Sequence, residues 1–201
     1  MLPLAGKPMI AWTIDAAQQS AELRRVIVST DDEEIARVSR EYGAEVPFVR
    51  PMELALDHSD HVAVVEHALD WLAEHEGAHP DYVMLLQPTS PLRTADDIDA
   101  CVSLARKADA RAVVSVSSMS PHAYRLGDDG VLERAVDSGE SRPLVAPNGA
   151  VYLNEVAALR ADRAFLPSGT LGYVMPSERS LDVDTEWDFR LADAALRGRA
   201  S

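Results

Sequence analysis

Residues 82–98 read YVMLLQPTSPLRTADDI, and they pass from an apolar strand through a polar loop into a helix. Pro88 and Pro91 restrict the backbone φ angles of the loop, so its polar groups have less conformational entropy to lose. Thr94 and Asp97 have the spacing of a capping box, which predicts the start of the helix. Ligands of open parallel sheets sit beyond the carboxyl ends of the strands. Four side chains of the loop are therefore placed either to hold a polar substrate or to satisfy the loop's own backbone: Gln87, Thr89, Ser90 and Arg93.

Strand-like and helix-like segments alternate on both sides of this stretch. Short β-branched or apolar segments predict further strands at 25–30, 45–49, 112–117, 150–153 and 172–175. Apolar residues at helical spacing predict helices at 8–19, 31–42, 60–74, 95–107 and 186–196. This alternation implies right-handed crossovers and a three-layer α/β/α fold around a mostly parallel sheet. A length of 201 residues fits a single domain of this kind, spanning residues 1–201.

Residues 119–141 have a different composition from the rest of the chain. They are rich in Gly, Asp and Ser, with short predicted strands near 123–126 and 131–134. We interpret residues 119–141 as an excursion from the sheet that acts as a flap or a dimerisation arm.

Composition excludes several classes of partner. Nineteen basic and 33 acidic residues give a net charge of −14, which disfavours nucleic acid and anionic membranes. Aromatic residues make up only 5%, too few for base-stacking platforms. No apolar stretch approaches the length of a membrane span, and the first residues lack the pattern of a signal peptide. The lone Cys101 excludes an internal disulfide, so a cytoplasmic protein is expected.

The chain opens on a predicted helix, with no strand and no glycine-rich phosphate loop before it. In doubly wound folds the first strand is usually central, and without it neighbouring strand edges are uncovered. We therefore expect the natural domain to begin upstream of Met1.

Six blocks of the sequence resemble, in order, the acylneuraminate cytidylyltransferases. They are PLAGKPMIAWTI at 3–14, VIVSTDDEEIA at 26–36, YGAEVPFVRPMELA at 42–55, LLQPTSPLRTADDI at 85–98, PNGAVYL at 147–153 and SLDVDTEWDF at 180–189. The resemblance implies a fold like that of the nucleotide-diphospho-sugar transferases, and a homodimer. It also implies a reaction that joins CTP to a nonulosonic (sialic-type) acid, with Mg²⁺ neutralising the charge that develops on the phosphates.

Asp182 and Asp184 are the candidate catalytic and metal-binding residues. They follow a predicted strand, where alternation puts both carboxylates on one face. Two hard oxygen donors suit Mg²⁺, which usually keeps several waters. The alternative is that they are solvated acids at a helix start, because Thr185 and Asp188 also have capping-box spacing.

The resemblance implies a set of six substrate-binding residues. They are Gln87, Arg50, Asn148, Tyr152, Arg142 and Phe165. The neutral amide of Gln87 suits hydroxyl and amide groups of an acid sugar, and Arg50 corresponds to a nucleotide-side arginine. Tyr152 and Phe165 correspond to sugar-pocket residues. A surface arginine, a half-buried strand tyrosine and a core phenylalanine remain the alternatives at positions 50, 152 and 165.

The sequence also departs from the family pattern. The family's CTP-binding strand and basic glycine-rich loop have no counterpart here, and Ala146 stands where many members have an arginine before Pro-Asn-Gly. Two hypotheses of different classes follow. The first is a cytidylyltransferase for a nonulosonic acid, with a related acid such as an eight-carbon ulosonate as a variant. The second is a non-catalytic homologue that binds sugar or a partner subunit.

Overall fold

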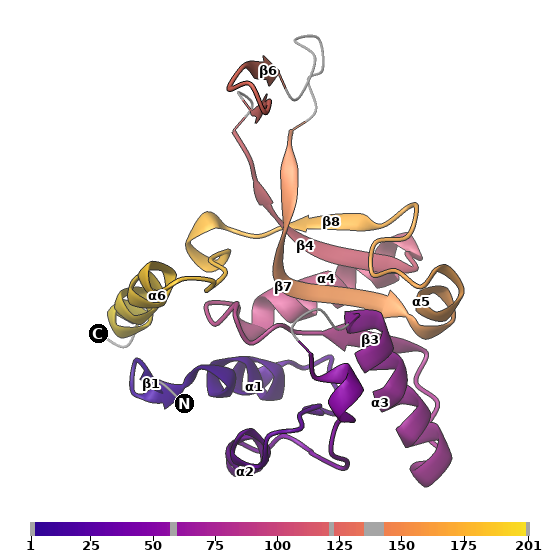
Figure 1. Cartoon of the computed structure of the whole chain (residues 1–201). Coiled ribbons are helices and arrows are strands. Elements are labelled where there is room, and N and C mark those ends of the chain that lie inside the picture. The colour runs from indigo at the N-terminus through magenta and orange to yellow at the C-terminus, as the bar shows by residue number, and fades with distance from the viewer. Residues whose placement is uncertain (1–2, 57–59, 121–122, 135–142, 200–201) are drawn as a thin grey trace.

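The computed structural model describes residues 3–56, 60–120, 123–134 and 143–199 (Figure 1). Its main sheet has the strand order β3–β7–β4–β8. These strands are β3 (Tyr82–Leu85), β7 (Val145–Glu155), β4 (Ala112–Ser118) and β8 (Leu171–Val174). β7 runs antiparallel to both of its neighbours, and β8 runs parallel to β4. Strands β3, β4 and β8 therefore share one direction, and β7 runs against them in the middle of a mixed sheet.

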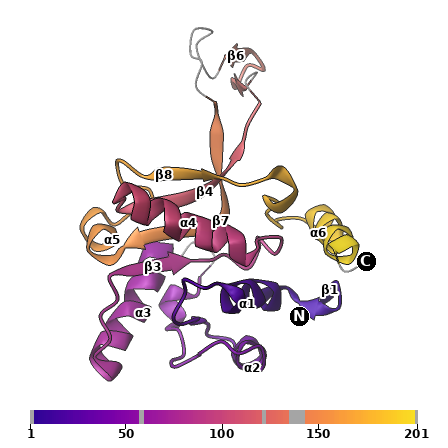
Figure 2. The same cartoon turned by 180° about the vertical axis from the view of Figure 1, so that it is seen from behind.

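Helices cover both faces of this sheet (Figures 1 and 2). α1 (Met9–Gln19) and α4 (Ala95–Ala108) pack on one face, where Ile98 and Cys101 join Val151 and Leu153 in a buried cluster. α3 (His61–Glu76) and α5 (Val156–Asp162) pack on the other, in a cluster that includes Leu69. Because β7 alternates its side chains between the faces, Tyr152 and the buried Asn154 face the α3 side. The expected three-layer α/β/α architecture is present.

The remaining helices lie around this sandwich. α2 (Glu33–Glu41) begins at Asp32, whose side chain accepts a hydrogen bond from the Ile35 amide. α6 (Glu186–Arg199) packs against the hairpin of β1 (Pro3–Leu4) and β2 (Lys7–Pro8), with Leu4 and Leu196 in a shared cluster. Two short 3₁₀ helices, η1 (Met52–Leu54) and η2 (Ser177–Arg179), complete the described elements.

The prediction of strands at 25–30 and 45–49 is wrong, because neither segment forms a continuous strand. These segments form only an isolated parallel bridge between Ile27 and Glu45. The amide of Val28 donates to the Glu45 carbonyl, and the amide of Glu45 donates to the Val26 carbonyl. A continuous ladder needs more paired neighbours than this, and the described residues supply no third strand beside these two segments.

The excursion at 119–141 leaves the sheet where β4 ends and β7 begins (Figure 1). Its described part contains a small antiparallel hairpin of β5 (Tyr124–Leu126) and β6 (Leu132–Arg134). Residues 121–122 and 135–141 of the excursion lie outside the described residues. Across the described chain, no helix combines the length and the apolar character that crossing a membrane requires.

Candidate active site

Gly149 is the point at which three segments of the chain meet. A Cβ atom there would lie 2.5 Å from Gln87 Oε1, 3.1 Å from Ser90 Oγ and 3.2 Å from Asp182 Oδ2. Its φ of +77° also belongs to the left-handed region, so both the backbone and the lack of space favour glycine. We call Gln87, Ser90, Gly149 and Asp182 the Gly149 site. Gln87 and Asp182, which were predicted from separate sequence blocks, thus lie around one backbone position.

The loop after β3 is fastened to this site by Arg93, which is 3% exposed. Its guanidinium donates to the carbonyl oxygens of Ala150 (2.7 Å) and Gln87 (2.6 Å) and to the hydroxyl of Thr13 (3.0 Å). Burial lowers the pKa of Arg93 to about 10, so the group stays protonated at neutral pH. For Arg93 the structure therefore favours support of the loop's backbone over contact with a substrate.

Asn148 is held from inside the fold. Its Oδ1 accepts from Ser115 Oγ (2.6 Å) and from the Ala150 amide (3.3 Å). Its Nδ2 donates to Ser180 Oγ (3.1 Å) and lies 3.4 Å from the sulfur of Met175. Both amide hydrogens and both oxygen lone pairs are thus occupied. These contacts hold the turn at position 149, and the substrate contact that the resemblance implies for Asn148 stays a prediction.

Tyr152 and Phe165 lie together on the α3 side of β7. Their ring centroids are 5.6 Å apart, and Phe165 also packs against the apolar cluster that α3 and α5 share. Burial, and secondly the negative charge of Asp182, raise the pKa of the Tyr152 hydroxyl. Tyr152 is therefore within electrostatic reach of the Gly149 site, and Phe165 links it to the core.

The acidic segment 180–184 runs alongside the loop after β3. The Val183 amide donates to the Thr89 carbonyl at 2.8 Å, which joins the two segments directly. Asp182 Oδ1 is buried and has no hydrogen-bond partner, whereas Asp184 is exposed. A buried carboxylate oxygen without a partner is costly unless a donor or a cation satisfies it.

These carboxylates fit a metal that takes few protein ligands. Within the described ranges, no group of three or more His, Cys, Asp or Glu side chains is arranged to hold a metal ion. Mg²⁺ is commonly held by one or two carboxylates together with water and substrate phosphates, so two acids are compatible with it. The capping box predicted for α6 is formed by Thr185 and Asp188, with the Thr185 amide 2.9 Å from Asp188 Oδ2. The alternative of solvated acids at a helix start thus fits the exposed Asp184, but it does not fit the buried Oδ1 of Asp182.

The predicted residue Arg50 contacts a different part of the chain. Arg50 contacts the 26–31 segment: its amide donates to the Thr30 carbonyl at 2.9 Å, and its Nη2 lies 3.4 Å from Asp31 Oδ1. Its Nε is buried without a partner. Arg142 falls outside the described residues.

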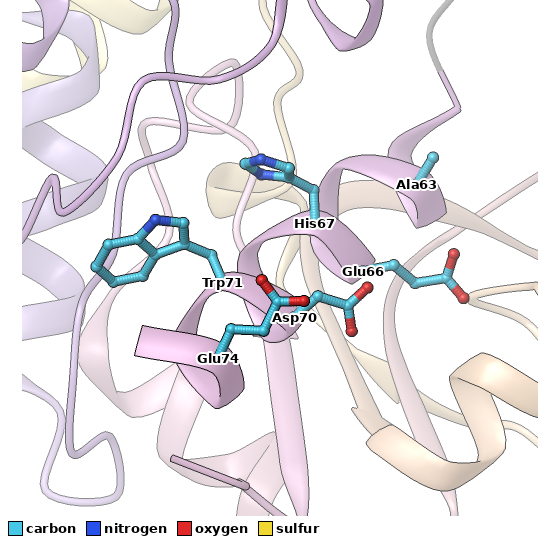
Figure 3. Close-up of a pocket in the computed structure, with 6 residues that line it drawn as sticks. All are labelled: Ala63, Glu66, His67, Asp70, Trp71 and Glu74. Carbon is cyan, nitrogen blue, oxygen red and sulfur yellow. The ribbon is translucent and has the colours of Figure 1, made fainter. Parts of the chain in front are cut away.

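A pocket of about 380 Å³ on α3 is separate from the Gly149 site (Figure 3). Residues of this one helix line it, and Figure 3 shows His67 and Trp71 on one side and three acids on the other. Two of those acids, Glu66 and Asp70, form ion pairs with arginines of α5 and the residue that follows it. This pocket contains none of the predicted site residues.

Sequence reasoning did not single out Gly149, Ser115 or Ser180. The Asn-Gly dipeptide at 148–149 was the available signal for the first, because it marks a turn with positive φ. The two serines carry no local signal, since their partner Asn148 lies far from both in the chain.

Comparison with known proteins identifies the class. A family profile described as cytidylyltransferase matches residues 1–140, and the chain belongs to this family of enzymes. The predicted resemblance is thereby confirmed. The chain is 35% identical over 206 residues to the CMP-N,N'-diacetyllegionaminic acid synthase of Legionella pneumophila, covering 96% of this chain and 87% of that protein. It is 34% identical to the N-acylneuraminate cytidylyltransferase of Escherichia coli, covering 95% of this chain and 46% of that protein. The chain thus spans about half the length of this second relative.

Solved structures of low sequence identity share the fold. A CMP:2-keto-3-deoxy-manno-octonic acid synthetase complexed with CTP matches with a TM-score of 0.70 at 16% identity, over 98% of this chain and 91% of that one. A 4-diphosphocytidyl-2C-methyl-D-erythritol synthase from Anaerococcus prevotii matches with a TM-score of 0.71 at 12% identity, over 98% and 92% of the two chains. The predicted α/β nucleotide-sugar transferase-like fold is confirmed.

Proposed function

We propose that this chain transfers CMP from CTP to a nonulosonic acid and releases pyrophosphate. The anomeric hydroxyl of the sugar acid would lose its proton and form a bond to the α-phosphorus, while the bond from that phosphorus to the pyrophosphate oxygen breaks. Family membership supports the nucleotidyl transfer. The names of relatives that make CMP-activated legionaminic and acylneuraminic acids support the class of acceptor.

The observation that carries the proposal is the meeting of Gln87 and Asp182 at Gly149. The side-chain amide of Gln87 forms no hydrogen bond with any described residue, so its donors and its acceptor are open to a ligand. Next to it, Asp182 has a buried oxygen without a partner. A polar sugar and a cation are the complements of these two groups.

Asp182 and Asp184 are the residues that would hold Mg²⁺. A bound Mg²⁺ stabilises the negative charge that develops on transferring phosphates. The contribution of the chain is to keep the two acids beside the loop after β3, through the backbone bond from Val183 to Thr89. Tyr152, with Phe165 behind it, would form the sugar side of the site, and Arg50 and Arg142 remain proposed substrate contacts.

We extend the proposal to assembly and location. The hairpin of the 119–141 excursion exposes Leu126, Val131 and Leu132, which are 72%, 55% and 63% accessible. An apolar group on a projecting hairpin is typical of a protein–protein contact, which supports a homodimer through this arm. A cytoplasmic location would suit an enzyme that consumes CTP and has a buried, unpaired cysteine.

Pyrophosphate release tests the function. The chain, and the product of the complete reading frame that encodes it, would be incubated with CTP, Mg²⁺ and one of four acids. These acids are an acylneuraminic, a diacetyllegionaminic, a pseudaminic and an eight-carbon ulosonic acid. We expect release with at least one nine-carbon acid and loss of release in Gln87→Ala. The matched variant Gln18→Ala removes an exposed glutamine whose amide donates to the Gly43 carbonyl, and it should stay active.

Calorimetry with CTP separates the second hypothesis. A folded protein that does not bind CTP and does not release pyrophosphate with any of the four acids would be a non-catalytic homologue. That result would overturn the proposed function.

A further inference from the structure

We propose that the ion pair between the buried Asp97 and the partly exposed Arg179 is a positioning device that sets where Asp182 lies in the active site. Neither residue belongs to the Gly149 site, and neither was a candidate on sequence grounds. The inference rests on the proposed function for its catalytic meaning, because that function gives Asp182 its role. The structural part of the inference is that Asp97 is linked to the acidic segment, and the hydrogen bonds alone support it.

Asp97 is a fully buried carboxylate with every oxygen engaged. It occupies the third position of α4 and is 0% exposed. Its Oδ2 accepts from the amide and hydroxyl of Thr94 at 3.0 and 2.9 Å and from Arg179 Nε at 2.9 Å. Its Oδ1 accepts from Arg179 Nη2 at 2.8 Å and from the Tyr173 hydroxyl at 3.1 Å. One side chain therefore joins the start of α4, strand β8 and the turn η2.

Arg179 is the last residue of η2, three positions before Asp182. Its two donors meet the two oxygens of Asp97 as a fork, which fixes the plane of the guanidinium as well as its distance. Arginine is suited to this task because its fork is rigid, whereas a lysine would supply one mobile point charge.

The chain from η2 to α6 is then fastened at three successive places. Arg179 is held by Asp97, the Ser180 hydroxyl accepts from Asn148 Nδ2 at 3.1 Å, and the Val183 amide donates to a carbonyl of the loop after β3 at 2.8 Å. Asp182 lies between the second and third of these places. Its own carboxylate has no hydrogen bond from the described residues to Oδ1, so the backbone has to hold it in position.

Stability alone is a weak reason for this ion pair. Burying the charge of Asp97 costs desolvation energy that its attraction to the partly exposed Arg179 often only offsets, and an apolar replacement is frequently as stable. Burial by itself raises the pKa of Asp97, but hydrogen bonds from Arg179 and Thr94 outweigh burial and bring this pKa below its ordinary value. Asp97 is therefore ionised at neutral pH, and the fork stays charged on both sides. A fixed charged fork next to a catalytic segment favours a role in geometry.

Amide hydrogen exchange at Val183 tests the structural link without reference to activity. In Arg179→Lys we expect the Val183 amide to exchange about tenfold faster, because the segment that presents it opens more often. The matched control is Arg106→Lys, which alters a forked arginine–carboxylate pair with Glu22 at the other end of α4. It should leave Val183 unchanged. Unchanged exchange in Arg179→Lys would overturn the proposal.

Metal binding tests the consequence for Asp182. Mn²⁺ would be titrated into the protein as a probe. The electron paramagnetic resonance signal of the free ion measures how much Mn²⁺ remains unbound. Residues that orient metal ligands typically change metal affinity by about 10- to 100-fold, and we expect a loss in that range for Arg179→Lys. In the active enzyme kcat should fall while the KM for CTP changes little. A loss of thermal stability with unchanged Mn²⁺ affinity would show a purely structural pair and contradict the proposal.

A double variant, Asp97→Asn with Arg179→Gln, guards against misfolding. It removes both charges, so no buried charge is left alone, but it also removes the fork. We expect it to fold and to show the same faster exchange at Val183. Failure of the proposed function is recognised separately, because the wild-type protein would then release no pyrophosphate. The exchange rate at Val183 would still show whether the ion pair holds the acidic segment.

Discussion

The two regions that the resemblance assigns to the substrate are built in different ways. Around Gly149, buried side chains cross-link distant segments: Arg93, Asn148 and Asp97 are all less than a tenth exposed and each bonds to at least two other parts of the chain. Around Arg50, an isolated bridge at Ile27, a few backbone hydrogen bonds and the partly exposed ion pair of Arg25 with Glu45 hold the segments together, and Phe48 packs against α3. The proposed metal and sugar side is therefore held by buried side-chain hydrogen bonds, and the proposed nucleotide side by contacts that are more exposed to solvent.

Asp182→Asn should remove activity from the region around Gly149. The neutral amide keeps the shape and removes the charge, so pyrophosphate release should fall by about 100- to 1,000-fold, as for other groups that stabilise developing charge. The steady-state rate with CTP and Mg²⁺ measures this. Asp188→Asn is the matched control, because Asp188 caps α6 and should affect stability more than turnover. Equal losses in both variants would contradict the assignment.

Gly149→Ala should disturb the geometry of the same region. The new methyl group would meet Gln87 Oε1 at 2.5 Å and would also sit at a φ of +77°. A left-handed conformation costs a non-glycine residue roughly 1–2 kcal/mol, and the clash adds to this. Gly77→Ala separates the two effects, because Gly77 has a φ of +64° but nothing within 4 Å of its Cβ. Thermal unfolding should show the larger loss for Gly149→Ala, and activity should fall only there.

Arg50→Ala tests the weaker region. Hydrogen bonds to charged groups contribute about 1.5–3 kcal/mol, so loss of a phosphate or base contact should raise the KM for CTP by roughly 10- to 100-fold. The KM for the sugar acid should stay the same, and stability should change little, since the ion pair with Asp31 is long and partly exposed. Arg37→Ala, an exposed arginine of α2, serves as the control. A shift in the sugar KM instead would place Arg50 on the other side of the site.

The smallest expected effect is the pH dependence that Asp97 confers. Its pKa in the folded protein lies below the ordinary value of 3.8, so the unfolded chain takes up the proton first as the pH falls. The stabilisation is thus complete above the ordinary value and is lost as the pH drops toward the folded value. The melting temperature of the wild type should therefore lose its advantage over Asp97→Asn below about pH 4. A difference between the two that does not change down to pH 3 would contradict this.

Local signals explain what the sequence could predict. The capping box of Thr94 and Asp97 and the Asp60 side chain that accepts from the Val62 amide mark helix starts within one turn of where they occur. The predicted helices at 60–74, 95–107 and 186–196 accordingly lie close to α3, α4 and α6. These signals act between neighbours in the chain and need no knowledge of the fold.

Features that depend on distant partners could not be predicted in this way. The strand predicted at 150–153 extends over Val145–Glu155 and runs antiparallel, because its length and direction are set by pairing with β3 and β4. The 25–30 segment has strand-forming residues but only one bridge to pair with. Likewise, Arg93 and Asn148 have the residue types of ligand contacts, and only their buried partners reveal that they support the backbone.

The bond from the Val183 amide to the Thr89 carbonyl has an evolutionary consequence. Because main-chain atoms form it, most replacements of either side chain leave the donor and the acceptor in place. Only proline at position 183 would delete the donor outright. Replacements of the Thr89 side chain should therefore leave the acidic segment joined to the glutamine loop, whereas the side chain of Val183 is also held by packing against the cluster of Leu4 and Leu196.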